Sequence, residues 1–206
     1  MNPFEVVRDF ESAVADYCNA RYCVAVNSCT NALFLSLMWF KTQGTLPDTI
    51  TIPRFTYVSV PMQIMHAGAK VLFRVQDDWS GAYQLSPLPV YDSARRFTAR
   101  MYRPGTFMCT SHHWSKTLGI QQGGCILHDN PVADDYLRRA RFDGRREGVP
   151  PDSDEFQDIG WHAYMSPEVA AEGLVRLSHL PRHNADLPWS GYPDLSKLTM
   201  FKREAA

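Results

Sequence analysis

The alternation of short apolar segments with helical ones is the feature that most constrains how this chain of 206 residues can fold. Apolar runs with strand character are expected at residues 22–26, 49–52, 70–75, 90–92, 106–110 and 125–128. Helices are expected between them, at residues 4–19, 31–41, 58–66, 132–142 and 166–177. This order favours an α/β domain with a mostly parallel sheet and helices on both of its faces.

Polar residues stand directly after three of the expected strands. Ser28, Asp92 and Ser111 each follow an apolar run, and Lys116 lies five residues beyond Ser111, ahead of the pair Gly123-Gly124. Ligands of such sheets bind beyond the carboxyl ends of the strands. We therefore expect these side chains to face one crevice.

Composition excludes several classes of function. A formal net charge of −1 gives no electrostatic reason to bind nucleic acid or an anionic membrane, and no apolar run is long enough to span a bilayer. The five cysteines include no CxxC pair, and His112-His113 has no suitably spaced acidic or thiol partner, so no metal site is expected. Reduced thiols indicate a cytoplasmic protein.

Other charged and polar segments are interpreted more simply. Arg95-Arg96 and Arg138-Arg139 are taken as solvated charges. Residues 144–158 are polar and contain proline, which predicts a mobile loop, and residues 182–206 predict an irregular C-terminal tail.

The crevice residues match the needs of one cofactor, pyridoxal 5'-phosphate. The amine of Lys116 can form a Schiff base with the cofactor aldehyde. Asp92 would face the pyridine nitrogen, and Ser28-Cys29-Thr30, at a strand-to-helix junction, would offer hydroxyls and amides to the phosphate. Tyr57 offers a flat ring to stack on the cofactor.

Each of these residues, taken alone, has a plainer interpretation. Ser28 and Asp92 are good helix caps, Tyr57 is a candidate core aromatic with Phe55 competing for its role, and most lysines like Lys116 lie on the surface. The order and spacing of the whole set favour the cofactor site.

The same segments resemble the DegT-type pyridoxal phosphate-dependent aminotransferases that act on nucleotide-linked keto sugars. Residues 25–33 resemble the phosphate-binding S-G-T-x-A-L stretch, with Cys29 at the usual glycine, and residues 53–57 resemble P-x-x-T-[FY]. Residues 91–95 resemble E-D-A-A-[QH], and residues 111–116 resemble S-F-x-x-x-K.

A further segment, residues 160–166, resembles G-Y-N-Y-R-M-S, with His162 at the asparagine that reaches the neighbouring subunit's phosphate in the family. The resemblance implies that Lys116 is the Schiff-base lysine, Asp92 the pyridinium partner and Ser111 a phosphate ligand. Arg95 replaces the usual glutamine or histidine.

The resemblance implies the large domain of the fold type I pyridoxal phosphate-dependent transferases, assembled as a homodimer with shared active sites. Residues 74–90 are shorter than their family counterpart, and the family's N-terminal arm and small C-terminal domain have no equivalent. We therefore expect residues 1–206 to form a single, shortened cofactor-binding domain.

Three functions follow from this resemblance. The first is an aminotransferase that moves an amino group, from glutamate as in the family, to a nucleotide-linked keto sugar through a Lys116 Schiff base. The second is a non-catalytic cofactor-binding relative that acts as a partner protein. The third is a sugar dehydratase, although such relatives carry histidine in place of the lysine.

Overall fold

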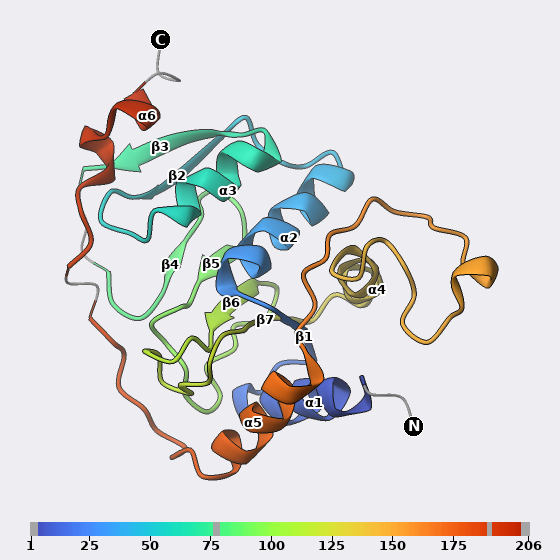
Figure 1. Cartoon of the computed structure of the whole chain (residues 1–206). Coiled ribbons are helices and arrows are strands. Elements are labelled where there is room, and N and C mark those ends of the chain that lie inside the picture. Colours follow the sequence, from blue (N-terminus) through green and yellow to red (C-terminus); the bar gives the residue numbers. More distant parts are fainter. Residues whose placement is uncertain (1–3, 76–78, 189–190, 203–206) are drawn as a thin grey trace.

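A computed structural model describes residues 4–75, 79–188 and 191–202, so short parts of the shortened segment 74–90 and of the expected tail lie outside the described residues. Figure 1 shows a layered molecule in which a central sheet lies between two groups of helices. None of the helices in the described part of the chain combines the length and apolar character that crossing a bilayer requires.

The main sheet has five strands in the order β1-β7-β6-β5-β4. They are β1 (Tyr22–Val26), β4 (Tyr83–Gln84), β5 (Val90–Asp92), β6 (Phe107–Ser111) and β7 (Gly124–His128). Strand β7 is antiparallel to both β1 and β6, β5 is parallel to β6, and β4 is antiparallel to β5. Strands β1, β5 and β6 therefore run in one direction and end at the same edge.

The α/β class is confirmed, but the sheet is mixed rather than mostly parallel. Among the described strands, one of the four pairings in the main sheet is parallel. A parallel connection needs a long crossover that is usually helical. Residues 112–123 hold no helix and turn the chain back, so β7 enters antiparallel. A separate parallel pair is formed by β2 (Thr49–Pro53) and β3 (Lys70–Arg74).

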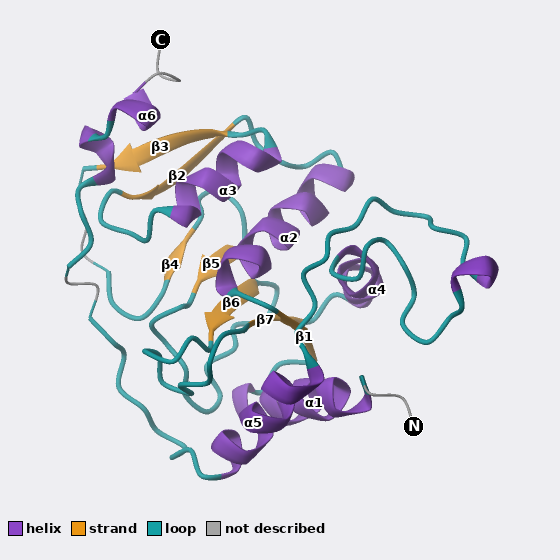
Figure 2. Ribbon diagram, viewed as in Figure 1, coloured by secondary structure: helices purple, strands orange, loops and turns teal. Residues whose placement is uncertain are grey.

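Helices cover both faces of the main sheet, as expected (Figure 2). The helices α2 (Cys29–Thr42), α3 (Ser59–Ala67) and α4 (Pro131–Ala140) pack with one face in a single apolar core. The helices α1 (Glu5–Cys18) and α5 (Pro167–Ser178) share a second core with the other face. This arrangement leaves the strand ends open to loops.

Local sequence explains where the helices begin and end. The Ser28 hydroxyl accepts the Asn31 amide at 3.2 Å and caps α2, and the Asn130 side chain accepts two amides at the start of α4. Helix α3 ends at Gly68, which has a φ of 96° that disfavours residues with a side chain. The Ser28 cap places the start of α2 directly after the end of β1.

The two segments expected to be irregular are both tied to the body. The loop 144–158 contains a short turn η1 (Pro151–Ser153). The backbone on its two sides comes together at Gly144 and Gly160, so closely that a Cβ on Gly160 would lie 1.7 Å from the Gly144 amide nitrogen. The mobility of this loop stays a prediction.

The C-terminal segment crosses the molecule after Pro181 and contains two short helical pieces, η2 (Leu195–Lys197) and α6 (Thr199–Lys202). The Leu187 amide donates to the Arg95 carbonyl at 2.8 Å. The Arg96 guanidinium grips Asp186 at 2.9 and 2.5 Å. The described part of the tail therefore belongs to the fold, although no regular element spans residues 182–194 in what the structure describes.

Candidate active site

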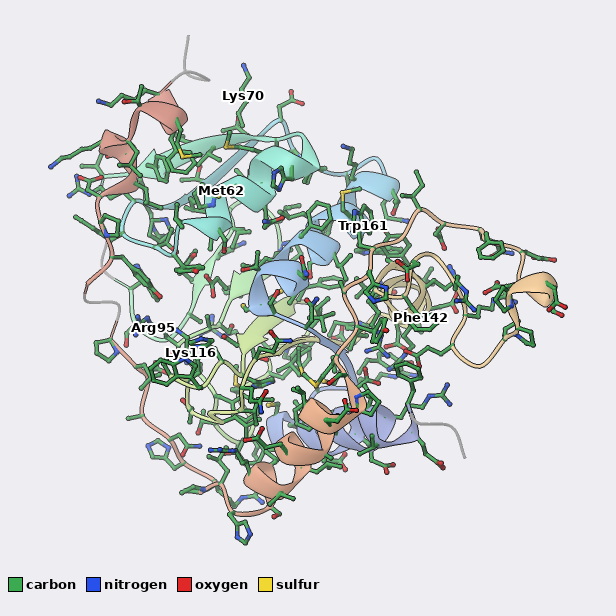
Figure 3. The ribbon with its side chains drawn as sticks, viewed as in Figure 1. Met62, Lys70, Arg95, Lys116, Phe142 and Trp161 are labelled. Atoms are coloured by element: carbon green, nitrogen blue, oxygen red, sulfur yellow. The ribbon has the colours of Figure 1, made fainter. Side chains whose placement is uncertain are left out.

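A cavity of about 450 Å³ lies where β1, β5 and β6 end. It is lined by eight of the nine residues predicted to form the site, namely Ser28, Cys29, Thr30, Tyr57, Asp92, Arg95, Ser111 and Lys116. Arg95 and Lys116 are labelled together in Figure 3, on the flank crossed by the C-terminal segment. The ninth residue, His162, is not among the lining residues.

Close backbone approach at Gly124 brings these segments together. Gly124 pairs with Val26 of β1 on one side and with Ser111 of β6 on the other. A Cβ on Gly124 would lie 2.6 Å from both the Cys29 nitrogen and the Thr110 oxygen. A glycine is required here because any side chain would push the start of α2 away from β6.

The first turn of α2 presents a phosphate-binding environment. Ser28 is both the helix cap and a lining residue, so its role as a cap does not take it away from the cavity. The Thr30 hydroxyl lies 2.9 Å from the Ser59 hydroxyl, which holds it at the wall of the cavity. A helix N-terminus carries partial positive charge and free amides, which favour an anion.

Cys29 occupies the first turn of α2 as a neutral thiol. Its Sγ donates to the Cys109 carbonyl at 3.5 Å. Burial raises the pKa of the Cys29 thiol well above its usual range, and the nearby carboxylate of Asp92 adds to the shift. The side chain is therefore a packed, uncharged group that does not repel an anion at the helix start.

Asp92 is a buried carboxylate held in a fixed orientation. It is 6% exposed, its Oδ2 accepts the Tyr83 hydroxyl at 2.8 Å, and its Oδ1 accepts the Ala94 amide at 2.9 Å. Burial raises the pKa of Asp92 above its usual value, against the hydrogen bonds and the positive charges of Lys116 and Arg95, which lower it. Such a group gains stability when a cationic partner arrives.

Lys116 lies half-buried in the turn that follows β6. Its backbone amide donates to the His113 carbonyl at 2.8 Å, which fixes the turn. Burial lowers the pKa of the Lys116 amine, the positive charge of Arg95 lowers it further, and Asp92 opposes the shift. More of the neutral amine is therefore present at a given pH than on a surface lysine, and the neutral form is the nucleophile.

Aromatic rings and Arg95 form the rest of the wall. The Arg95 Nε donates to the Tyr192 hydroxyl at 3.2 Å, and its guanidinium carbon lies 4.8 Å from the Tyr192 ring centre. Tyr57 is 55% exposed, with its ring centre 6.3 Å from that of Tyr192. Tyr57 is thus a cavity residue and not a core aromatic, while its competitor Phe55 is not among the lining residues.

His162 lies on the surface, away from this cavity. Its side chain is 72% exposed, its Nδ1 lies 2.9 Å from Asp143 Oδ2, and its ring packs edge-on against Tyr164. Its role toward a second subunit stays a prediction.

The residues that were not predicted from the sequence include three aromatic ones. Trp79 and Tyr192 line the cavity, and Tyr83 holds Asp92 from the short strand β4. The ring centres of Trp79 and Tyr83 lie 4.8 Å apart in an edge-on contact. Two large aromatic residues four positions apart, in a stretch otherwise rich in Asp, Gly, Ser and Pro, were the sequence feature that could have indicated them. Tyr192 stands alone in the tail, without any local pattern.

Fold and site together define a three-layer α/β domain with a lysine and a carboxylate at a strand-end cavity. The sequence profile of the DegT/DnrJ/EryC1/StrS aminotransferase family matches residues 2–87, so this part of the chain is similar to that family. The Bacillus subtilis spore coat polysaccharide biosynthesis protein SpsC is 42% identical over 74 residues, which are 35% of this chain and 18% of that protein.

Solved structures extend the likeness of the fold beyond the region of sequence similarity. The structure of AtS13 from Actinomadura melliaura superposes with a TM-score of 0.75 at 17% identity, over 84% of this chain and 59% of the other. NtdA from Bacillus subtilis, solved with the bound cofactor PMP, superposes with a TM-score of 0.68 at 15% identity, over 85% and 48%. The chain thus spans about half the length of these solved proteins.

Proposed function

We propose that this chain holds pyridoxal 5'-phosphate in the cavity around Lys116 and acts as an aminotransferase on a nucleotide-linked keto sugar. The observation that carries the proposal is the meeting of Lys116, Asp92 and the start of α2 in one cavity. Its volume of about 450 Å³ lies within the range of small-molecule sites.

The residues present fit the proposed cofactor. The Ser28, Thr30 and Ser111 hydroxyls and the amides at the start of α2 would hold the phosphate. Asp92 would accept a hydrogen bond from the protonated ring nitrogen, because a buried carboxylate is stabilised by a cationic partner. The less basic amine of Lys116 would attach to the aldehyde.

When bound, the cofactor supplies an electron sink for the pair of electrons left when a C–H bond breaks. The Asp92 carboxylate keeps the ring nitrogen protonated, because a buried negative charge favours a neighbouring cation. The Lys116 Nζ, once it is no longer attached to the cofactor, would carry the proton between the substrate carbon and the cofactor carbon, first as general base and then as general acid. Burial, and after it the charge of Arg95, lower the pKa of that amine, which makes it better able to release the proton again.

Support for the substrate class comes from the family name and from the polysaccharide-related name of SpsC. We extend the proposal to glutamate as amino donor, to a homodimer with shared sites and to the cytoplasm. The described cysteines are all free thiols, which suits that compartment. The exposed imidazole of His162 is available to a second subunit.

The first experiment records the absorption spectrum of the purified protein with added pyridoxal 5'-phosphate, followed by borohydride reduction and mapping of the modified peptide. We expect a near-visible band and an adduct on Lys116. Lys116→Ala should lose both, while Lys70→Ala, at an exposed position of β3, should keep both. An adduct on another lysine would contradict the assignment.

The alternative functions differ in their products. Release of 2-oxoglutarate from glutamate, together with amination of a keto sugar, supports the aminotransferase. A deoxy sugar without amine would indicate the dehydratase, against which the lysine at position 116 argues. Tight cofactor binding with no reaction toward any amino donor would indicate a partner protein.

The homodimer has its own test, which is sedimentation with and without cofactor. We expect a dimer, with His162→Ala weakening cofactor binding while leaving the dimer intact. A monomer that binds cofactor with wild-type affinity would contradict the role proposed for His162.

A further inference from the structure

A second cavity, of about 500 Å³, lies at the opposite end of β1 and shares no lining residue with the cavity around Lys116. Its walls come from α1, the start of β1, α4 and the loop that follows α4. Figure 3 labels Phe142 beside this loop, far across the view from Lys116 and Arg95. Six of its lining residues are arginines, namely Arg8, Arg21, Arg138, Arg139, Arg145 and Arg146.

Three of these arginines are used by ion pairs that cover the free edge of β1 or clamp α4. Arg138 Nη1 donates to Glu11 at 2.6 Å, and its Nη2 donates to the Cys23 carbonyl at 3.2 Å. Arg139 pairs with Asp135 and with Asp158, and Arg8 lies 3.6 Å from Glu147. These guanidinium groups are neutralised by the fold itself.

The guanidinium groups of the other three have no ion pair in the described part of the chain, although the Arg146 backbone amide donates to Asp154 at 2.7 Å. These three arginines are Arg21, Arg145 and Arg146. The lining includes four carboxylates, of which Glu11, Asp135 and Glu147 are already paired and Asp16 is exposed. Arg138 and Arg139 also pair with Asp134 and Asp158 outside the lining. Among the described residues, the lining therefore leaves three guanidinium groups and the carboxylate of Asp16 without an ion pair.

Arg145 shows that this excess is built into the wall. Its Nε is buried, and no acceptor for it lies among the residues that the structure describes. Its guanidinium carbon lies 5.4 Å from the Phe142 ring centre, so an aromatic face holds the group in place. A buried donor without an acceptor is unfavourable, and an anionic oxygen would supply the missing acceptor.

We propose that this cavity binds the phosphate group of a small molecule through Arg21, Arg145 and Arg146. A phosphate monoester carries about −1.5 to −2 charges at neutral pH, so its oxygens would supply acceptors for the guanidinium groups that have no ion pair. Arginine donates in a planar fork that suits phosphate oxygens. The cavity volume has room for an organic group attached to the phosphate.

Inorganic phosphate tests the proposal, by NMR of the arginine Nε–H groups and by calorimetry at constant ionic strength. The Arg145 resonance, identified by its loss in Arg145→Gln, should shift on titration with phosphate. Arg145→Gln together with Arg146→Gln should weaken binding at this site at least tenfold. Arg103→Gln, which removes a guanidinium stacked on Tyr91 elsewhere, should leave it unchanged.

Two results would overturn the proposal. One is an Arg145 resonance that does not move at millimolar phosphate. The other is an equal shift with chloride at matched ionic strength, which would mean general screening and no phosphate site. Ser111→Ala is the control for phosphate that binds in the cavity around Lys116. Because Ser111 lines that cavity, the variant should leave the shift of the Arg145 resonance intact.

Discussion

The two ends of β1 treat buried charge in opposite ways. At its start, Glu11 is 3% exposed and accepts hydrogen bonds from Arg138, from Arg141 and from the Ala25 amide. At its far end, Asp92 has only neutral hydrogen-bond donors, and the Lys116 amine has no ion pair within the described residues.

The pKa directions express the same contrast. Around Glu11, burial lowers the pKa of Arg138 and Arg141, but the Glu11 carboxylate and the other acidic neighbours outweigh burial and raise both values, which keeps the two arginines charged. Around Lys116, burial moves the pKa values of Asp92 and Lys116 toward neutrality. Charges that the protein pairs internally serve the fold, whereas groups left unpaired in a cavity are available to a ligand.

The largest effect should come from removing the Lys116 amine from the cavity. Lys116→Ala removes both the attachment point and the proton carrier, so the half-reaction with glutamate should fall by roughly 10²–10⁴-fold or more. Single-turnover kinetics of 2-oxoglutarate release would measure this loss. Wild-type turnover in the variant would refute the aminotransferase proposal.

Substitutions in the ion-pair cluster around Glu11 should change the stability of the protein and not its turnover. Glu11→Gln leaves two arginines without their buried carboxylate, which should cost about 3–5 kcal/mol of the free energy of unfolding. Asp135→Asn, at a partner that is 72% exposed, should cost about 0–1 kcal/mol. Urea unfolding of both variants checks the difference, and equal losses would contradict the contrast drawn here.

Tyr83→Phe sharpens the role of Asp92 without removing it. The loss of the 2.8 Å hydrogen bond should raise the pKa of Asp92 and weaken ring protonation, which should slow the half-reaction by about tenfold. Tyr91→Phe is the matched control, because the Tyr91 hydroxyl reaches only Gln84, at 3.5 Å. The pH dependence of the absorption band separates this effect from a simple loss of packing.

The smallest effect should be a shift in pH dependence in Arg95→Gln. Arg95 lowers the pKa of Lys116, so removing its charge raises that pKa and reduces the neutral amine at a given pH. The pH profile of cofactor attachment should therefore move to higher pH. A shift to lower pH, or none, would show that Arg95 does not act on Lys116 by charge.

Sequence reasoning located most of the cavity because the relevant side chains follow strands. Ser28, Asp92 and Ser111 meet even though the sheet is mixed, since β1, β5 and β6 still run in one direction and only β7 reverses. The expected mostly parallel sheet was wrong because hydrophobic runs carry no record of strand direction.

Contacts between distant segments were out of reach of local patterns. The interpretation of Arg138-Arg139 as solvated charges was wrong, since the partner Glu11 lies on a different helix. Arg96, also taken as solvated, is paired with Asp186 of the tail. Tyr192 also reaches the site from the C-terminal segment, where it contacts Arg95, and no local sequence pattern predicts such a distant contact.

Gly124 also makes the cavity depend on a complete sheet. It lies against the start of α2 and the end of β6 at once, so Ser28 and Ser111 line one cavity because β7 stands between β1 and β6. A chain with an incomplete sheet would hold the lysine, the carboxylate and the serines without bringing them together. The absorption band of the proposed cofactor is therefore expected to report that the sheet is complete.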